Sequence, residues 1–483
     1  MQNRMPLVEA MLKYKNEKVY PFHTPGHKGG RGMEALLKNE LGAGAVAMDV
    51  SLMSELDDIH APSSYIMEAQ NLAAQLYGSD RCFFAVNGTT GAIHAMLMAD
   101  CRAGDKVLVP RNAHRSVAGA LLLANLEPVF AMPEYDAVFG INTQITPQAV
   151  EAMFARHAGI KAVLVTSPNY YGQAADLKAI AGIAHAHNAV LLVDEAHGPH
   201  LGFSSKLPPS ALQCGADACA QSTHKILGAM TQCSLLHVKG GRINLTRAVE
   251  AVSLLTTTSP NYLLMASIDA ARYTLSVQGE KLIERALTAA EKLRSCLSKF
   301  AGLKLLDVGC TGKNGIAGFD CTKVTVNTAA WGYSGTEAGD SLRKAGIAVE
   351  LTDAQNVLFL VTFADGGEEY DAVLEKISRV FAGLEQHKRA PLKEQNCWKL
   401  PEFVTAVPLR SAFDAETESM PLQKAEGRIC AEQVSFYPPG IPVLWPGELV
   451  TAAVIDYCLR MKKLGLPVSG PADYTLTELR VIK

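Results

Sequence analysis

The chain has 483 residues, of which 48% are hydrophobic and 19% charged, a composition that suits a large buried core and excludes a disordered or disulfide-stapled protein. Its 45 basic and 48 acidic side chains give a net charge of −3, without the basic runs that favour nucleic-acid binding. The 11 cysteines form no C-x-x-C pair, and we find neither a membrane-spanning apolar run nor a secretory signal, so we expect a cytoplasmic protein with reduced thiols and no metal site.

The first sixty or so residues are rich in Gly and Pro around 21–30 and are predicted to be irregular, with a helix following at 63–77. From residue 81 onward, short apolar strands alternate with helical stretches. The predicted strands are 82–86, 106–109, 128–131, 162–166, 190–194, 216–220 and 234–238, and helices between them are 91–98, 116–124, 147–157 and 176–187. Several strands are apolar throughout, which is typical of parallel strands covered on both faces. This predicts a doubly wound, mostly parallel α/β sheet.

A long helix at 261–300 is predicted to close this domain. Strands at 303–308, 323–326 and 357–362, with helices at 336–345 and 368–386, then give a smaller α+β unit. The charged segment 387–396 marks a boundary, and the last unit contains a Pro-rich stretch at 437–448 that we predict to be a stiff extended loop. The expected organisation is 1–75, 76–300, 301–390 and 391–483.

Ligands of such sheets bind beyond the carboxyl ends of the strands. After the first strand, Gly88, Thr89 and Thr90 open a helix and could hold a phosphate with backbone N–H groups and hydroxyls. An ordinary tight turn with a capping threonine explains the same residues. His114 follows the second strand, where it could stack on a flat ligand or simply be solvated.

Asp194 ends a buried strand, where a carboxylate needs a partner or a cationic ligand. Ser222, His224 and Lys225 follow the next strand. The letters D-E-A-H at 194–197 also match a helicase box, but the chain lacks a G-x-x-x-x-G-K-[ST] loop. A phosphate cradle, an imidazole, a carboxylate and a lysine at one rim together favour pyridoxal 5′-phosphate (PLP), whose aldehyde binds a lysine and whose ring nitrogen pairs with an acid.

Six stretches carry a resemblance to a known family: P-F-H-T-P-G-H-K at 21–28, E-L-D-D-I-H at 55–60, N-G-T-T-G at 87–91, D-E-A-H-G at 194–198, S-T-H-K at 222–225 and Y-P-P-G-I-P-V-L-W-P-G-E at 437–448. The sequence resembles the fold type I, PLP-dependent Orn/Lys/Arg decarboxylases, which share the aspartate aminotransferase-like fold. It is most similar to their short bacterial form without the amino-terminal wing domain, and in overall pattern to Gram-positive arginine decarboxylases.

The resemblance implies that Lys225 carries the cofactor, Asp194 meets the pyridine nitrogen and His114 stacks on the ring. Gly88, Thr89, Thr90, Ser222 and His224 are then expected at the phosphate, and His197 beside the ring. Thr258 and Ser259 resemble a segment that reaches the partner subunit's cofactor, which implies an obligatory homodimer with shared sites and a role for residues 1–75 in the site and the dimer.

The implied activity is decarboxylation of a basic L-amino acid, with L-arginine to agmatine and CO2 for polyamine synthesis favoured over lysine or ornithine. Lys225 or His224 could return the proton to Cα. Asp57, Asp58 and Glu448 are candidate carboxylates for the substrate cation, although Asp57 and Asp58 could instead cap the following helix. His27 and Lys28 are candidate substrate or entrance contacts. Two other readings stay open, namely another fold type I aminotransferase or lyase and a non-enzymatic regulatory protein.

Overall fold

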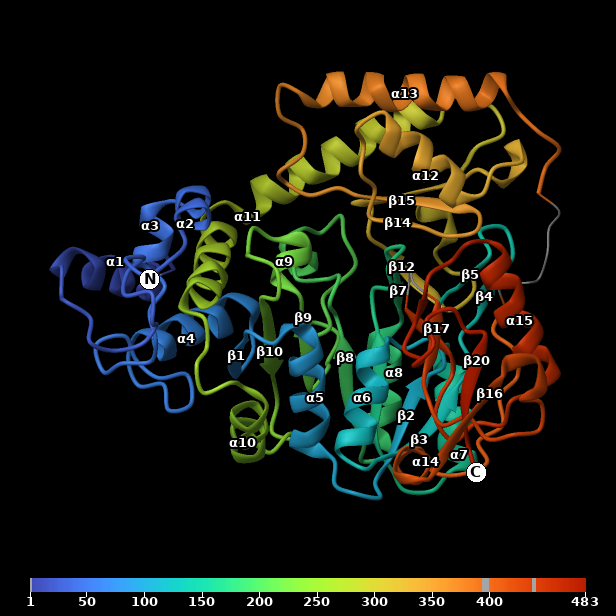
Figure 1. Ribbon diagram of the computed structural model, residues 1–483, viewed down its shortest axis with the longest axis horizontal. Helices are drawn as coiled ribbons and strands as arrows, with labels where there is room; N and C mark the ends of the chain where they lie inside the picture. The colour runs from blue at the N-terminus through green and yellow to red at the C-terminus, as the bar shows by residue number, and fades with distance from the viewer. Residues whose placement is uncertain (1, 393–398, 437–439) are drawn as a thin grey trace. The chain divides into compact units, whose positions relative to one another are not determined.

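The computed structural model describes residues 2–392, 399–436 and 440–483 (Figure 1). The chain forms two compact units, one comprising residues 1–100, 190–205 and 209–282, and the other comprising 101–189, 206–208 and 283–483. Each unit combines segments that are distant in the sequence. The four consecutive domains expected from the sequence therefore stay a prediction.

The main feature is a seven-stranded sheet with the order β1-β10-β9-β8-β6-β2-β3. Neighbours β8 and β9, β2 and β6, and β2 and β3 run parallel, whereas β10 is antiparallel to both β1 and β9. The predicted doubly wound, mostly parallel sheet is confirmed. Its strands in chain order are β1 (Arg81–Ala85), β2 (Lys106–Pro110), β3 (Glu127–Ala131), β6 (Ile160–Thr166), β8 (Val190–Asp194), β9 (Ala218–Gln221) and β10 (Ser234–Val238).

Helices connect these strands as the sequence pattern predicts. Side-chain caps define several of their starts: Thr146 accepts a hydrogen bond from Ala149 N, and Asp176 accepts one from Ala179 N. The helices of this region are α4 (Tyr65–Tyr77), α5 (Gly88–Asp100), α6 (Arg115–Leu123), α7 (Pro147–Arg156), α8 (Leu177–Ala186), α9 (Thr223–Ile226), α10 (Leu245–Leu255) and the 36-residue α11 (Tyr262–Leu297). The sequence did not predict α10.

The prediction that the first sixty residues are irregular was wrong. They contain α1 (Pro6–Glu17), α2 (Ala35–Leu41) and α3 (Ala43–Ala47), drawn in blue in Figure 1. The buried face of α1, formed by Leu7, Ala10 and Met11, packs into a core with residues of α4, β1 and α11. Burial of this apolar stripe stabilises a helix whose N-cap residue, Met5, provides no side-chain cap.

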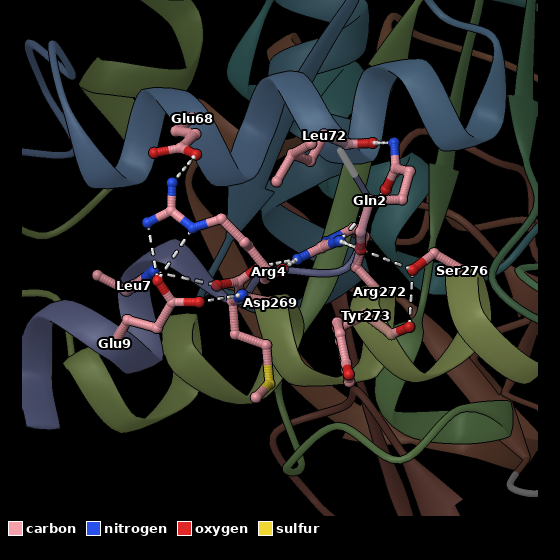
Figure 2. Close-up of polar contacts among 11 residues, drawn as sticks. Gln2, Arg4, Leu7, Glu9, Glu68, Leu72, Asp269, Arg272, Tyr273 and Ser276 are labelled. Atoms are coloured by element: carbon pink, nitrogen blue, oxygen red, sulfur yellow. Dashed lines mark hydrogen bonds and ion pairs between the residues drawn. The ribbon is translucent and has the colours of Figure 1, made fainter.

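A buried ion pair on α11 anchors this N-terminal segment (Figure 2). Arg272 Nη2 lies 2.7 Å from Asp269 Oδ1, and both side chains are at most 1% exposed. The other Asp269 oxygen accepts a 3.1 Å hydrogen bond from Leu7 N at the start of α1. Arg272 also donates to the backbone carbonyls of Gln2 and Arg4, so one ion pair fixes the chain that leads into α1.

Two smaller sheets complete the second unit. One has the order β11-β13-β15-β14 and packs with α12 and α13; the other has the order β18-β17-β19. Their bounds are β11 (Lys304–Leu305), β13 (Lys323–Asn327), β14 (Leu351–Thr352), β15 (Asn356–Leu360), α12 (Gly335–Lys344), α13 (Tyr370–Gln386), β17 (Val434–Phe436), β18 (Ile441–Leu444) and β19 (Val468–Ser469).

The remaining strands and α-helices are three strand pairs and two helices. They are β4 (Tyr135–Asp136), β5 (Ile141–Asn142), β7 (Gln173–Ala175), β12 (Ile316–Phe319), α14 (Leu409–Asp414), β16 (Thr417–Pro421), α15 (Ala452–Lys463) and β20 (Glu478–Ile482). Of the predicted loop at 437–448, residues 437–439 lie outside the described residues, and Ile441–Leu444 form an edge strand instead of a loop. The predicted boundary at 387–396 also lies partly outside them. Within the part of the chain that the structure describes, no helix is long and apolar enough to cross a bilayer.

Candidate active site

Two adjacent parallel strands bring an acid and a lysine to one end of the sheet. Asp194 ends β8, where it lies opposite Ala220 of β9, and Lys225 follows four residues after β9 ends. The Asp194 side chain is 2% exposed and accepts a hydrogen bond of 3.2 Å from Ala196 N. Burial raises the pKa of Asp194, and the positive charge of Lys225 offsets part of that rise. The site thus holds a buried carboxylate suited to a cationic partner.

His197 contacts the lysine directly. Its Nε2 atom lies 3.0 Å from Lys225 Nζ, and the ring is 3% exposed. The sequence placed His197 beside the cofactor ring but did not predict this contact. The imidazole can exchange a proton with the lysine amine across this distance.

Three hydroxyl groups form a chain at the start of α5. Thr89 Oγ1 hydrogen-bonds Ser222 Oγ and lies 2.7 Å from Ser234 Oγ, which donates to Gln221 O at 2.6 Å. Thr89, Ser222 and Ser234 are all buried. Sequence reasoning missed Ser234 because it begins β10, whereas ligand-binding residues are expected after strand ends.

The first turn of α5 has the geometry of an anion cradle. Gly88 has φ +68°, a conformation that favours glycine, and Thr89 and Thr90 follow it within the helix. Thr90 is exposed. Backbone N–H groups at this helix start, with the nearby hydroxyls, provide the donors that a phosphate accepts.

His224 precedes the lysine, and one hydrogen bond defines which of its ring nitrogens carries a proton. Its Nδ1 atom lies 2.9 Å from the carbonyl oxygen of Cys233, so Nδ1 carries the proton that it donates. Burial lowers the pKa of His224. Its Nε2 atom is therefore the position where a proton can be gained or lost.

His114 belongs to the second unit, at the start of α6. Its Nδ1 atom accepts a hydrogen bond from Ser116 N at 3.2 Å and lies 2.9 Å from Ser116 Oγ. This imidazole caps α6, and its stacking on a cofactor stays a prediction.

Asp57 and His60 of the E-L-D-D-I-H stretch form hydrogen bonds with neighbouring segments of the chain. Both carboxylate oxygens of Asp57 accept backbone N–H bonds of 2.9 to 3.0 Å, from Asp58, Ser63, Ser64 and Ile66. Asp57 therefore caps α4, and its contact with a substrate cation stays a prediction. His60 lies 3.0 Å from Ser253 Oγ and 3.1 Å from Thr257 O, and so holds the segment that leads to Thr258 and Ser259. Both of these residues are exposed.

The other candidate substrate contacts already have protein partners. Asp58 Oδ1 accepts a hydrogen bond from His60 N, His27 Nε2 lies 3.0 Å from Asp49 Oδ2, and Lys28 Nζ donates to His23 O. All three side chains are half-buried. Their contact with substrate stays a prediction.

Glu448 belongs to a buried ion pair instead. Its Oε2 atom lies 2.9 Å from Arg111 Nη2, and both side chains are 2% exposed. Arg111 also donates to the carbonyl oxygens of Pro442 and Val443, and its guanidinium lies 5.7 Å from the centroid of the Trp445 ring. This carboxylate neutralises Arg111, and its contact with the substrate cation stays a prediction.

Solved structures define the class of fold. The chain aligns with serine palmitoyltransferase carrying PLP over 66% of this chain and 76% of that one, with 17% identity and a TM-score of 0.51. It aligns with lysine decarboxylase LdcF of Francisella novicida over 100% of this chain and 81% of that one, with 22% identity and a TM-score of 0.84. The fold is that of the fold type I PLP-dependent enzymes.

The family follows from sequence comparison. Residues 5–326 match the Orn/Lys/Arg decarboxylase major domain, and residues 400–470 match the Orn/Lys/Arg decarboxylase C-terminal domain. The chain belongs to the Orn/Lys/Arg decarboxylase family and is a PLP-dependent decarboxylase of a basic amino acid.

Full-length relatives include proteins named arginine decarboxylase. One from Bacillus anthracis is 41% identical over 100% of this chain and 98% of its own length, and one from Bacillus subtilis is 39% identical over the same shares. The inducible lysine decarboxylase of Escherichia coli is 25% identical over 96% of this chain and 78% of its own length.

The donor set fits PLP. The buried carboxylate of Asp194 forms no ion pair within the described ranges, which leaves it available to a protonated ring nitrogen. Lys225 provides the amine, and the hydroxyl chain at α5 matches a phosphate. Asp194, Lys225, Thr89 and Ser222 all belong to the first unit.

Proposed function

We propose that the chain converts L-arginine to agmatine and CO2, as a step of polyamine synthesis. The observation that carries this proposal is the 41% identity, over the whole chain, to a protein named arginine decarboxylase, against 25% to a named lysine decarboxylase. Arginine, lysine and ornithine all end in a cation, so the motifs of the site do not separate them.

In this proposal Lys225 holds the cofactor aldehyde and Asp194 meets the ring nitrogen, while Thr89, Thr90, Ser222 and His224 hold the phosphate. PLP would supply an electron sink for the electron pair that stays on Cα when CO2 leaves. The buried Asp194 carboxylate is fixed before the reaction starts and stabilises positive charge at the ring nitrogen.

Proton movement falls to three atoms of the chain. His197 Nε2, 3.0 Å from Lys225 Nζ, can take a proton from that amine and return it. His224 Nε2 is the second position, because its Nδ1 proton is committed to Cys233 O. Either the lysine amine or His224 Nε2 supplies the proton that replaces the carboxylate on Cα.

We also propose a homodimer with shared sites. Thr258 and Ser259 are exposed on the loop after α10, as expected for residues that complete a neighbouring site. Large apolar side chains are exposed on the same unit, including Phe22 at 90% and Leu254 at 73%. Burial of such side chains favours association with a second copy. Analytical ultracentrifugation tests this, and a monomer with full activity would contradict it.

The test of the activity is a product assay. The holoenzyme is incubated with equal concentrations of arginine, lysine and ornithine, and amines are identified by mass spectrometry. Agmatine as the main product supports the proposal, whereas cadaverine or putrescine overturns the substrate assignment alone. Lys225→Ala is the control, and we expect it to form no amine; turnover by this variant would remove Lys225 from its role.

A further inference from the structure

Glu195 is a buried carboxylate to which the reaction assigns no role. It follows Asp194 directly and is 0% exposed. Within residues 2–392, 399–436 and 440–483, it forms no ion pair that would compensate its charge. A buried, uncompensated carboxylate is costly, so its presence one residue from the site requires an explanation.

The side chain of Glu195 connects three segments. Its Oε1 atom accepts a hydrogen bond of 2.7 Å from Ala211 N, and its Oε2 atom accepts one of 2.7 Å from Gln221 Nε2. Gln221 is the last residue of β9, so Glu195 joins the ends of β8 and β9 through their side chains.

This link lies between the residues proposed to hold the two ends of the cofactor. Glu195 N donates to Ala220 O at 3.0 Å, and the next backbone bond, from Ser222 N to Ala196 O, is 3.3 Å long. Ala196 N in turn donates to Asp194 Oδ1. The 2.7 Å side-chain bond is thus shorter than both of these backbone bonds between the segment of Asp194 and the segment of Ser222.

We propose that Glu195 is a positioning residue that, through Gln221, fixes the separation between Asp194 and Ser222 and so matches the site to the length of the cofactor. This inference rests on the proposed roles of Asp194 and Ser222. Glu195 contacts neither reacting atoms nor cofactor in this account; it acts through Gln221 and the two strand ends.

The amide oxygen of Gln221 allows a variant of Glu195, Glu195→Gln, that removes the charge of this side chain but keeps its hydrogen bonds. Among the described residues, Gln221 Oε1 has no hydrogen-bond partner. In Glu195→Gln the new amide can still accept from Ala211 N, and a turned Gln221 amide can accept from the new NH2 group. Glu195→Ala removes both bonds and leaves two buried donors unpaired.

A matched control lies at the opposite end of the same strands. Asp217 precedes β9, and its Oδ2 atom accepts a 2.8 Å hydrogen bond from Leu191 N of β8. It is 2% exposed. Asp217→Ala therefore breaks a comparable buried link between these strands, away from Asp194 and Ser222.

The experiment measures the dissociation constant of PLP by absorbance titration, together with the melting temperature of each holoenzyme. We expect Glu195→Ala to weaken PLP binding at least about tenfold, since two bonds to a charged group are lost, while Glu195→Gln and Asp217→Ala stay within about threefold of the wild type. Equal PLP affinity for Glu195→Ala and Asp217→Ala overturns the proposal, because Glu195 would then support only the fold. A loss in Glu195→Gln as large as in Glu195→Ala also overturns it.

If Glu195→Ala does not fold, Gln221→Met removes the same bond from the other side and is judged by the same criterion. Turnover of arginine is measured separately on the wild type. A wild type that binds PLP but forms no agmatine refutes the proposed substrate, and leaves the effect of Glu195 on PLP affinity as an independent result.

Discussion

Replacing Asp269 with alanine should release the N-terminal segment. In the native chain its two oxygens bind Arg272 Nη2 at 2.7 Å and Leu7 N at 3.1 Å. The variant leaves the Arg272 guanidinium, 1% exposed, without its counter-charge. Breaking a buried pair in this way costs about 3–5 kcal/mol.

We expect a cost in free energy at the lower end of that range. Arg272 keeps carbonyl partners at Gln2 and Arg4 after the substitution, so part of its solvation is replaced. A cost of about 3 kcal/mol, at 1.36 kcal/mol per factor of ten, raises the population of the undocked segment roughly 150-fold.

Hydrogen–deuterium exchange of the amides of α1 measures this population. The control is Arg4→Ala, which removes pairs with Glu9 and Glu68 from a side chain that is 51% exposed and should change exchange by less than about fivefold. The double variant Asp269→Leu/Arg272→Met removes the unpaired charge together with the bonds to Leu7 N, Gln2 O and Arg4 O, so its α1 amides should stay less protected than those of the wild type. Exchange in Asp269→Ala that matches the Arg4→Ala control would refute the role assigned to the ion pair.

Three further predictions concern the site and its surroundings. Asp194→Ala should retain PLP, measured by absorbance, while its turnover falls at least about a hundredfold; loss of PLP without a change in rate per bound cofactor would contradict this. Burial raises the pKa of Glu195 from 4.5 to about 7, so the folded chain binds this proton more tightly than the unfolded chain. The stability that this proton contributes is therefore complete below pH 4.5 and is lost as the pH rises through 7. The wild type should lose up to about 3 kcal/mol over this window relative to Glu195→Gln, and parallel melting curves of the two proteins from pH 5 to 8 would disprove it. Asp57→Ala, which removes the acceptor for four backbone N–H groups, three of them at the start of α4, should cost about 2 kcal/mol or more, seen as a lower melting temperature. Asp58→Ala serves as its neighbour control, and an equal effect of both would argue against the cap.

The parallel sheet could be predicted because the apolar composition of each strand indicates that the strand is buried. All five residues of β8 are buried, and a strand covered on both faces is apolar throughout. Asp194 and Lys225 could be singled out for a related reason, since both follow such strands and parallel strands end at the same edge.

Features that depend on distant partners could not be predicted. Asp269, 262 residues away from Leu7, accepts the hydrogen bond from Leu7 N at the start of α1, and no local pattern at α1 indicates this partner. The partner of Glu448 is Arg111, 337 residues away, and a carboxylate in a family motif looks the same whether it binds substrate or an arginine. The partners of Asp57 could not be predicted either, because they are backbone amides, which every residue except proline possesses.

The environment of Arg111 restricts how this chain can be shortened or recombined. Its side chain is 2% exposed, and its two Nη atoms donate to Pro442 O, Val443 O and Glu448 Oε2, all from the last fifty residues. Ending the chain near residue 400 would remove all three acceptors together with Trp445, whose ring lies 5.7 Å from the guanidinium, and would open the Arg111 side chain to water. A truncation or a domain exchange in the C-terminal region therefore also changes the segment after β2.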